Sequence, residues 1–141
     1  MTRLTRRERE CLISVYELSA DGWPARVRDI SDQMKVKPPT AVGFLERLSA
    51  VLMVERGAAG YRLSAKGREM IDGIMRSHRI FETFLTGIGV ALQEACRIAS
   101  EVDMHIEPPT INALCAHIGH PSECPHGRKI PGGDDLDTER R

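Results

Sequence analysis

The chain has few aromatic residues, few cysteines and no long apolar run. Aromatic residues make up 4% of its 141 residues, and its four cysteines are scattered along the sequence. Because no apolar stretch is long enough to span a bilayer and no secretory signal is evident, we expect a cytoplasmic protein without a membrane partner. In a reducing compartment, scattered cysteines are more often metal ligands, redox sensors or buried apolar residues than disulfides.

The formal net charge of zero hides an uneven distribution. Lysine plus arginine and aspartate plus glutamate number 20 each. Residues 1–80 carry 15 basic and 10 acidic side chains, whereas residues 81–141 carry 5 and 10. The N-terminal half is therefore suited to a polyanion, and the C-terminal half is suited to cations.

The spacing of apolar residues predicts a mainly α fold with one small β-hairpin. A first helix begins after Thr5, which is a plausible N-cap, and stops at Asp21-Gly22. Pro38-Pro39 suit the first turn of the third helix, and Ser64 is expected to cap the fourth. The expected elements are helices at 5–20, 27–34, 40–53 with Pro38-Pro39 at its entry, 65–85, 90–105 and 108–118, with a hairpin at 54–63. The order of the first elements is typical of a winged helix-turn-helix.

Residues suited to DNA contact gather in this winged segment. Pro39, Thr40, Ala41 and Gly43 are small or hydroxylated, so they let the start of the third helix approach base edges and phosphates. The basic side chains that can neutralise phosphates are Arg28, Lys35, Lys37, Arg47, Arg56 and Arg62. Two alternatives remain open, a helical domain whose basic residues are only solvated and a winged helix that binds protein.

Two helices in the second half carry side chains typical of metal ligands. His78 and Glu82 are spaced i, i+4 and share a helix face, as do Cys96, Ser100 and Asp103 on the next helix. Helices joined by a short loop pack antiparallel, which brings the two faces together. An imidazole, a thiolate and carboxylates suit Fe(II), Mn(II), Co(II), Ni(II) or Zn(II). The alternative is a solvated surface His–Glu pair.

The C-terminal tail is rich in sulfur and imidazole. Cys115, His117, His120, Cys124 and His126 fall within 12 residues. They could form a second, separate metal site of the kind that suits Zn(II). We favour a loop folded over the domain with Cys115 buried, because the spacing fits no zinc-finger pattern. A third alternative is a redox centre or iron–sulfur cluster at Cys96, Cys115 and Cys124.

Several segments together resemble the diphtheria toxin repressor family of metal-dependent (iron and manganese) transcriptional regulators. They are RERECLISVYEL, VRDISDQMKVKPPTAVGFLERL, YRLSAKGREM, HRIFETFL, EACRI and GHPSECPHGRKIP. The resemblance implies a winged helix-turn-helix at 1–64, an α-helical dimerisation and metal-binding domain at 65–131, and a flexible tail at 132–141. It further implies a homodimer that binds double-stranded operator DNA when Fe(II) or Mn(II) is bound. Many family members carry an SH3-like domain, for which this chain is too short.

By position, the resemblance implies that the metal ligands are Glu10, His78, Glu82, Cys96, Ser100, Asp103 and Met104. In the set His78, Glu82 and Cys96, every position has a side chain that can bind a metal ion. The other set departs from the family pattern, which usually has a carboxylate–histidine pair where this chain has Asp103-Met104. A metal shared by Glu10 and the second set would tether the two domains and favour the DNA-binding state.

We therefore expect a metal-dependent repressor. The runner-up is a DNA-binding redox or iron–sulfur sensor that uses the cysteines. An enzyme with a small-molecule substrate is not expected, because no activated nucleophile is evident and no general base lies near a glycine-rich phosphate loop.

Overall fold

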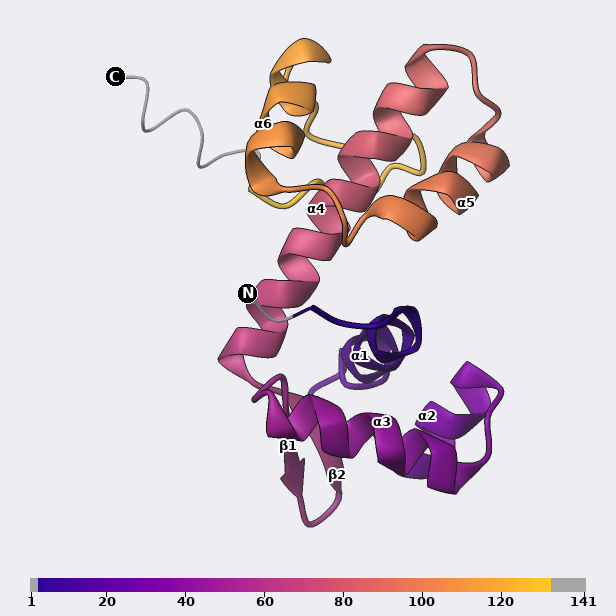
Figure 1. Ribbon diagram of the computed structural model, residues 1–141, viewed down its shortest axis with the longest axis vertical. Helices are drawn as coiled ribbons and strands as arrows, with labels where there is room; N and C mark the ends of the chain where they lie inside the picture. Colours follow the sequence, from indigo (N-terminus) through magenta and orange to yellow (C-terminus); the bar gives the residue numbers. More distant parts are fainter. Residues whose placement is uncertain (1–2, 133–141) are drawn as a thin grey trace. The chain divides into compact units, whose positions relative to one another are not determined.

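The computed structural model describes residues 3–132, which form six α-helices and one two-stranded antiparallel sheet (Figure 1). The expected fold class, mainly α with a β-hairpin wing, is confirmed. The elements in chain order are α1 (Arg6–Leu18), α2 (Val27–Met34), α3 (Pro38–Ala50), β1 (Val54–Gly57), β2 (Gly60–Leu63), α4 (Ala65–Gly87), α5 (Leu92–Val102) and α6 (Pro108–His117).

The chain divides into two compact units between Ile71 and Asp72, inside α4, and each unit is described here by itself. The domain boundaries expected from the sequence stay a prediction. Of the expected tail at 132–141, residues 133–141 lie outside the described residues. No helix within residues 3–132 is long and apolar enough to cross a bilayer.

The three helices of the first unit begin and end where local signals place them. Thr5 caps α1 through a capping box, since its hydroxyl accepts from the Glu8 backbone N–H and the Glu8 side chain accepts from the Thr5 N–H. Lys35 ends α2 in the left-handed conformation, with φ of 56°, and Pro38 and Pro39 open α3. The helices enclose a core whose fully buried side chains include Leu12, Val15, Ile30, Leu45 and Leu48.

The hairpin is joined to the helices by a short backbone bridge. Tyr61 pairs with Arg56 across the hairpin and also exchanges two 2.8 Å hydrogen bonds with Ala25. This requires glycine at position 60, because a Cβ there would lie 2.4 Å from the Ala25 carbonyl oxygen and φ is 143°. The bridge holds the wing, close to its turn, against the loop that precedes α2.

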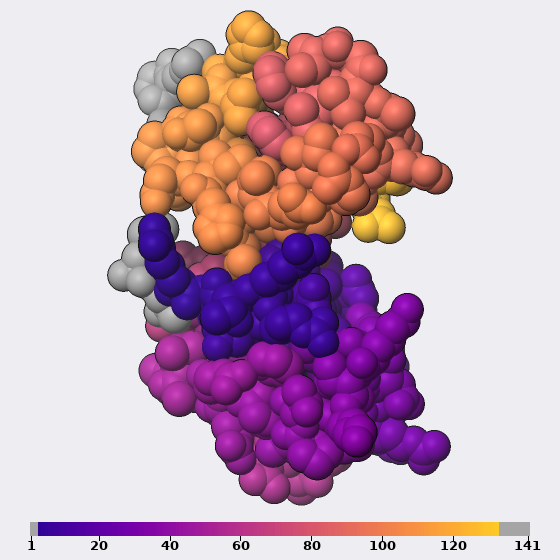
Figure 2. All heavy atoms as spheres, turned by 45° about the vertical axis from the view of Figure 1, so that its right-hand side comes forward, coloured from indigo at the N-terminus to yellow at the C-terminus, as the bar shows by residue number. Residues whose placement is uncertain are grey.

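The second unit consists of the remainder of α4, α5, α6 and the segment 118–132. Its apolar core is formed by side chains of α4, α6 and the segment 118–132, which are Ile80, Ile111, Cys115, Cys124 and Ile130. On the face drawn in Figure 2, the orange surface of α5 and α6 lies beside the salmon surface of the end of α4. In the part of α4 that belongs to this unit, Ile74, Ile80 and Glu82 are at most 3% exposed.

The element boundaries differ from the expected ones at several helix ends, including those of the third and fifth helices. The third helix ends at Ala50, and Leu52 lies in the following turn with φ of 63° and 68% exposure. The fifth helix spans Leu92–Val102, which is shorter than the expected 90–105. Asp103 is its C-cap and still donates its backbone N–H to the Ala99 carbonyl, whereas His105 lies in the turn beyond.

Candidate metal centre

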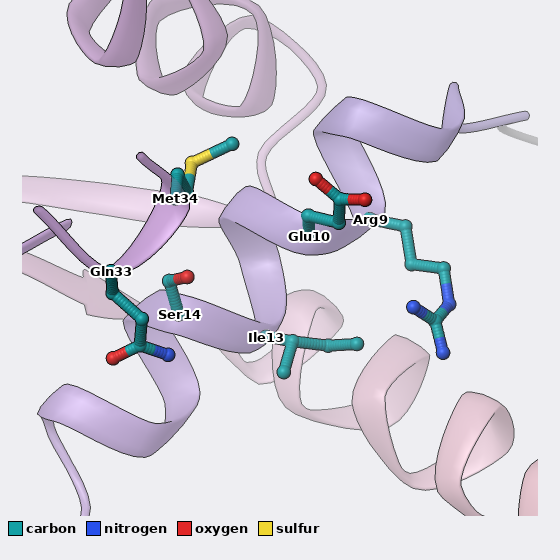
Figure 3. Close-up of a pocket in the computed structure, with 6 residues that line it drawn as sticks. All are labelled: Arg9, Glu10, Ile13, Ser14, Gln33 and Met34. Carbon is teal, nitrogen blue, oxygen red and sulfur yellow. The ribbon is translucent and has the colours of Figure 1, made fainter. Parts of the chain in front are cut away.

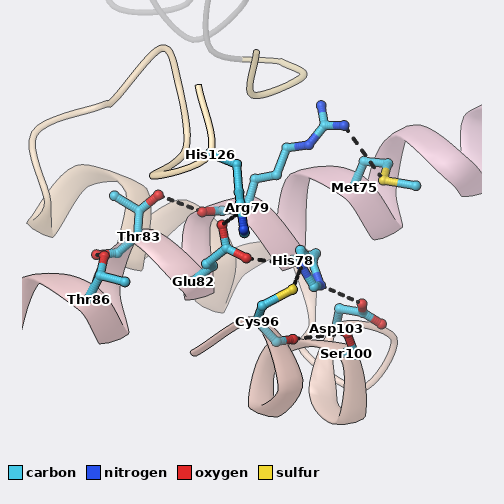
Figure 4. Close-up of polar contacts among 10 residues, drawn as sticks. All are labelled: Met75, His78, Arg79, Glu82, Thr83, Thr86, Cys96, Ser100, Asp103 and His126. Carbon is cyan, nitrogen blue, oxygen red and sulfur yellow. Dashed lines mark hydrogen bonds and ion pairs between the residues drawn. The ribbon is translucent and has the colours of Figure 1, made fainter. Parts of the chain in front are cut away.

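The carboxylate of Glu82 lies at the middle of the polar cluster in the second unit (Figure 4). Glu82 is on α4, one turn after His78, and is only 1% exposed. Its Oε1 lies 2.8 Å from His126 Nδ1, and its Oε2 lies 3.3 Å from His78 Nε2. Within the described part of the chain, Oε2 receives no hydrogen bond of acceptable geometry. Because an unsatisfied buried charge is costly, this oxygen fits a cation as its partner.

Helix α5 adds a sulfur donor beside the same histidine. Cys96 Sγ lies 3.6 Å from His78 Nε2, and donor atoms of His78, Glu82 and Cys96 all lie within 4.8 Å of one another. Burial, and then the neighbouring Glu82 carboxylate, raise the pKa of the Cys96 thiol. The two expected helix faces therefore do meet, and they place nitrogen, oxygen and sulfur donors together.

Asp103 faces the opposite nitrogen of the same imidazole. Its Oδ2 lies 3.2 Å from His78 Nδ1, and its side chain is fully buried. If Nδ1 carries the proton and donates to Asp103, then Nε2 keeps its lone pair toward Glu82 and Cys96. This contact suits Asp103 to orienting His78, and the ligand role expected of Asp103 stays a prediction.

The other residues of the expected second ligand set are placed differently. The Ser100 hydroxyl donates to the Cys96 carbonyl oxygen at 2.9 Å, one turn earlier on α5. Met104 is half-buried in the turn after α5. Glu10 belongs to the first unit, where it pairs with Arg6 at 3.8 Å and with Arg7. The ligand roles of these residues stay a prediction.

Glu10 also lines a pocket of about 230 Å³ between α1 and α2 (Figure 3). The other lining residues are Arg9, Ile13, Ser14, Gln33 and Met34. The Glu10 carboxylate and the Ser14 hydroxyl both belong to α1 and are four residues apart, so they lie on one side of the helix.

The C-terminal loop reaches Glu82, which the sequence did not indicate. Donor atoms of Glu82, Cys124 and His126 form a second group within 4.8 Å of one another. Cys124 is 6% exposed and also belongs to the apolar core. The sequence analysis placed Cys124 and His126 in one loop, but nothing in the sequence specified the helix against which this loop packs.

The remaining sulfur and imidazole groups of the tail lie elsewhere. The Cys115 Sγ is buried and lies 3.5 Å from His120 Nδ1. His117 packs edge-on against the ring of Phe84, with centroids 6.5 Å apart. The five tail residues therefore occupy three environments rather than one common site, and the binding of metal by the tail remains untested.

Most of the residues expected to contact DNA are exposed on the first unit. Arg28, Lys35, Lys37, Pro39, Thr40, Arg56 and Arg62 are exposed, and Gly43 is half-buried. Arg47 is exposed but is held by Glu8 at 3.2 Å and lies 4.9 Å from the centroid of the Phe44 ring. Ala41 is fully buried, because it lies on the inward face of α3, so its side chain packs in the core.

The donor set fits a divalent transition metal. It offers imidazole, thiolate and carboxylate, which are the ligands of borderline metals such as Zn(II) and Fe(II). The donors come from α4, α5 and a loop pinned by buried side chains, so they are held together by the fold itself. The buried Glu82 oxygen without a protein donor supports the same assignment.

The fold and this cluster together define a winged-helix protein whose helical second unit carries metal-ligand side chains. Residues 64–132 match the family model described as "Iron dependent repressor, metal binding and dimerisation domain". The chain belongs to the diphtheria toxin repressor family of metal-dependent regulators.

Curated relatives are about 30% identical to this chain over the aligned residues. The diphtheria toxin repressor of Corynebacterium jeikeium is 30% identical over 141 residues, which cover 92% of this chain and 57% of that protein. The transcriptional regulator MntR of Escherichia coli O6:H1 is 30% identical over 101 residues, covering 71% of this chain and 65% of that protein. The chain thus spans somewhat more than half the length of these relatives.

Solved structures share the fold. A hypothetical protein of Sulfolobus solfataricus aligns with a TM-score of 0.81 and 29% identity, covering 91% of this chain and 99% of that chain. The manganese regulator SloR aligns with a TM-score of 0.77 and 27% identity, covering 94% of this chain and 61% of that chain.

Proposed function

We propose that the protein is a transcriptional regulator that binds operator DNA as a homodimer when a divalent transition metal occupies its second unit. The observation that carries this proposal is the buried Glu82 carboxylate, whose Oε2 receives no protein hydrogen bond and lies beside His78 and Cys96. Such an arrangement is destabilising without a cation and favourable with one.

Family membership supports the DNA-binding and dimeric parts of the proposal. The matched family model describes a metal-binding and dimerisation domain, and the relatives are named as repressors and regulators rather than enzymes. None of these names points to a cysteine-based sensor. The exposed basic side chains of the winged unit, such as Lys35, Lys37 and Arg56, would neutralise phosphates.

The names of the relatives favour iron or manganese as the metal. They include an iron-dependent repressor of Mycobacterium leprae and a manganese regulator, and one solved neighbour is ScaR with bound Zn²⁺. Bound metal supplies a positive charge that holds the donor side chains in one arrangement. In this chain those side chains are His78, Glu82 and Cys96.

Regulation requires that the metal bind more tightly to the DNA-binding state than to the other state. A coupling free energy of about 1–3 kcal/mol is usual between two such sites, and it acts equally in both directions. DNA should therefore tighten metal binding by the same factor by which metal tightens DNA binding. This reciprocity distinguishes a linkage from a metal that only stabilises the fold.

The test is a DNA-binding titration under anaerobic, reducing conditions. An operator sequence is first selected from a random DNA pool with the metal-loaded chain, and its dissociation constant is then measured with Fe(II), Mn(II), Zn(II) or chelator. We expect metal to tighten binding about 5–150-fold. The Glu82→Gln variant should lose this response, whereas Glu69→Gln, an exposed acid on the same helix, should keep it. An equal response in Glu82→Gln and the parent chain would reject the proposal.

A further inference from the structure

Helix α3, the second helix of the helix-turn-helix, turns one narrow face directly away from the core of the first unit. Its buried residues are Ala41, Leu45 and Leu48, which lie on one side of the helix. Because successive residues are 100° apart around a helix, the opposite side is the line through positions 39, 43, 46 and 50. The second helix of such a motif lies in the major groove with its outward face toward the base edges. This line is therefore the part of α3 that is placed nearest to the bases.

Glu46 is the one residue of these four whose side chain can form a hydrogen bond. Pro39, Gly43 and Ala50 have no polar side-chain atom to offer to a base. Gly43 also leaves the helix surface open, since a Cβ at this position would meet nothing within 4 Å. Glu46 itself is exposed. Its carboxylate is thus the polar group that α3 carries on its outermost line.

The residues that usually recognise purines are scarce in α3. Arginine and lysine pair with guanine, and asparagine and glutamine pair with adenine. The helix contains no lysine, asparagine or glutamine, and its one arginine is Arg47. The Arg47 side chain already has partners, because its Nε lies 3.2 Å from the Glu8 carboxylate and its guanidinium carbon lies 4.9 Å from the centroid of the Phe44 ring. Glu46 therefore stands out as the charged side chain of α3 that is directed outward.

A carboxylate has one complementary base in the major groove. An ionised carboxylate only accepts hydrogen bonds, and the N4 amino group of cytosine only donates them. Guanine and thymine present acceptor atoms in this groove, and adenine presents an acceptor beside its amino group. A carboxylate pressed against an acceptor is desolvated without a partner, which is costly. The same side chain therefore favours cytosine and disfavours the other three bases.

We propose that Glu46 determines one base of the operator by accepting a hydrogen bond from N4 of a cytosine in each half-site. This inference rests on the proposed function, because it takes α3 as the helix that recognises operator DNA. It adds the identity of one base and of the residue that selects it. Because its negative charge is repelled by the phosphates, Glu46 contributes discrimination between sequences rather than overall affinity.

Parallel selections from a random DNA pool are the first test. The full-length parent chain, Glu46→Gln and Glu46→Ala are each used with and without metal under anaerobic, reducing conditions. We expect cytosine at one position of each half-site selected by the parent chain. Glu46→Gln should admit adenine there, because glutamine can pair with adenine N6 and N7, and Glu46→Ala should show no preference. The control is Glu69→Gln, which removes an exposed acid of α4 and should select the same sequence as the parent chain.

A modified base is the second test. N4-methylcytosine still pairs with guanine but carries a methyl group in place of the N–H that points into the major groove. Placed at the selected position, it should weaken binding by the parent chain about 5–150-fold, the range for one mismatched base pair. Binding by Glu46→Ala should change less than about threefold, because this variant makes no contact with N4. An equal loss in both chains would show that Glu46 does not accept this hydrogen bond.

The outcomes separate this inference from the proposed function. If the parent chain and Glu46→Ala select the same bases in a metal-dependent manner, Glu46 does not specify a base, and the regulator is supported. If the cytosine depends on Glu46 but selection does not depend on metal, the inference is supported and metal-dependent regulation is rejected. The absence of any enriched sequence would reject both.

Discussion

The contact between Asp103 and His78 provides a prediction about metal affinity. The Asp103 carboxylate oxygen lies 3.2 Å from His78 Nδ1, its side chain is fully buried, and His78 is 17% exposed. A carboxylate in this position fixes the tautomer and the orientation of a ligating imidazole, and losing such a partner costs about 10–100-fold in metal affinity. In free energy this is about 1.4–2.7 kcal/mol.

The perturbation separates the hydrogen bond from the charge. In Asp103→Asn the amide oxygen can still accept the Nδ1–H, so we expect a loss of about 10-fold. In Asp103→Ala both contributions are lost, and we expect about 100-fold. Affinity is measured by competition with a chromophoric chelator under anaerobic conditions. The control is Glu101→Gln, which removes an exposed carboxylate of α5 that pairs with Arg97 at 2.9 Å.

Two results would refute this reasoning. If Asp103→Ala binds metal within threefold of the parent chain, the contact does not orient His78. If the Co(II) absorption bands of Asp103→Asn change in position and number, Asp103 is itself a ligand, as the family resemblance implied. The expected result is a weaker affinity with an unchanged Co(II) spectrum.

Three further predictions concern pH, DNA and stability. Because burial raises the pKa of the Cys96 thiol, a metal ion must displace a proton when it binds the sulfur. The apparent metal affinity should therefore rise about tenfold per pH unit between pH 6.5 and 7.5 on account of this proton. The affinity of the Cys96→Ser variant should depend less steeply on pH. The Arg56→Ala variant, changed at an exposed residue of the wing, should bind DNA more weakly, and its slope of log affinity against log salt should be smaller by about 1. An unchanged slope would show that Arg56 does not contact the DNA. Thr5→Ala should lower the free energy of unfolding by about 1 kcal/mol in urea titrations, because it removes the capping box of α1, and no change would show that this cap contributes nothing to stability.

Local signals in the sequence predicted most of the secondary structure. The Thr5 cap and the paired prolines at 38–39 each act within one turn of helix, so the residues around them are sufficient to place these ends. Ser64 acts in the same way, since its Oγ accepts from the Gly67 N–H at 2.9 Å. Helical periodicity also predicted that His78 and Cys96 lie close together, because it determines which face of its helix each side chain occupies.

Helical periodicity does not predict which residues of other segments join the polar cluster around Glu82. His126 meets Glu82 across 44 residues, through a loop whose path is set by the burial of Ile130 and Cys124 in the core. Asp103 follows the last turn of α5, and its partner was determined by how α5 packs on α4. Both contacts arise from tertiary packing, which the spacing of residues in a motif does not specify.

The unsatisfied oxygen of Glu82 has a consequence for the lifetime of the protein. A chain without metal keeps a carboxyl oxygen without a hydrogen-bond partner in its interior, which costs folding free energy, whereas binding of an ion adds stability by mass action. The population of open, protease-sensitive molecules should therefore increase when metal is scarce. Metal supply would then govern how much of the regulator survives in the cell as well as how tightly each molecule holds DNA.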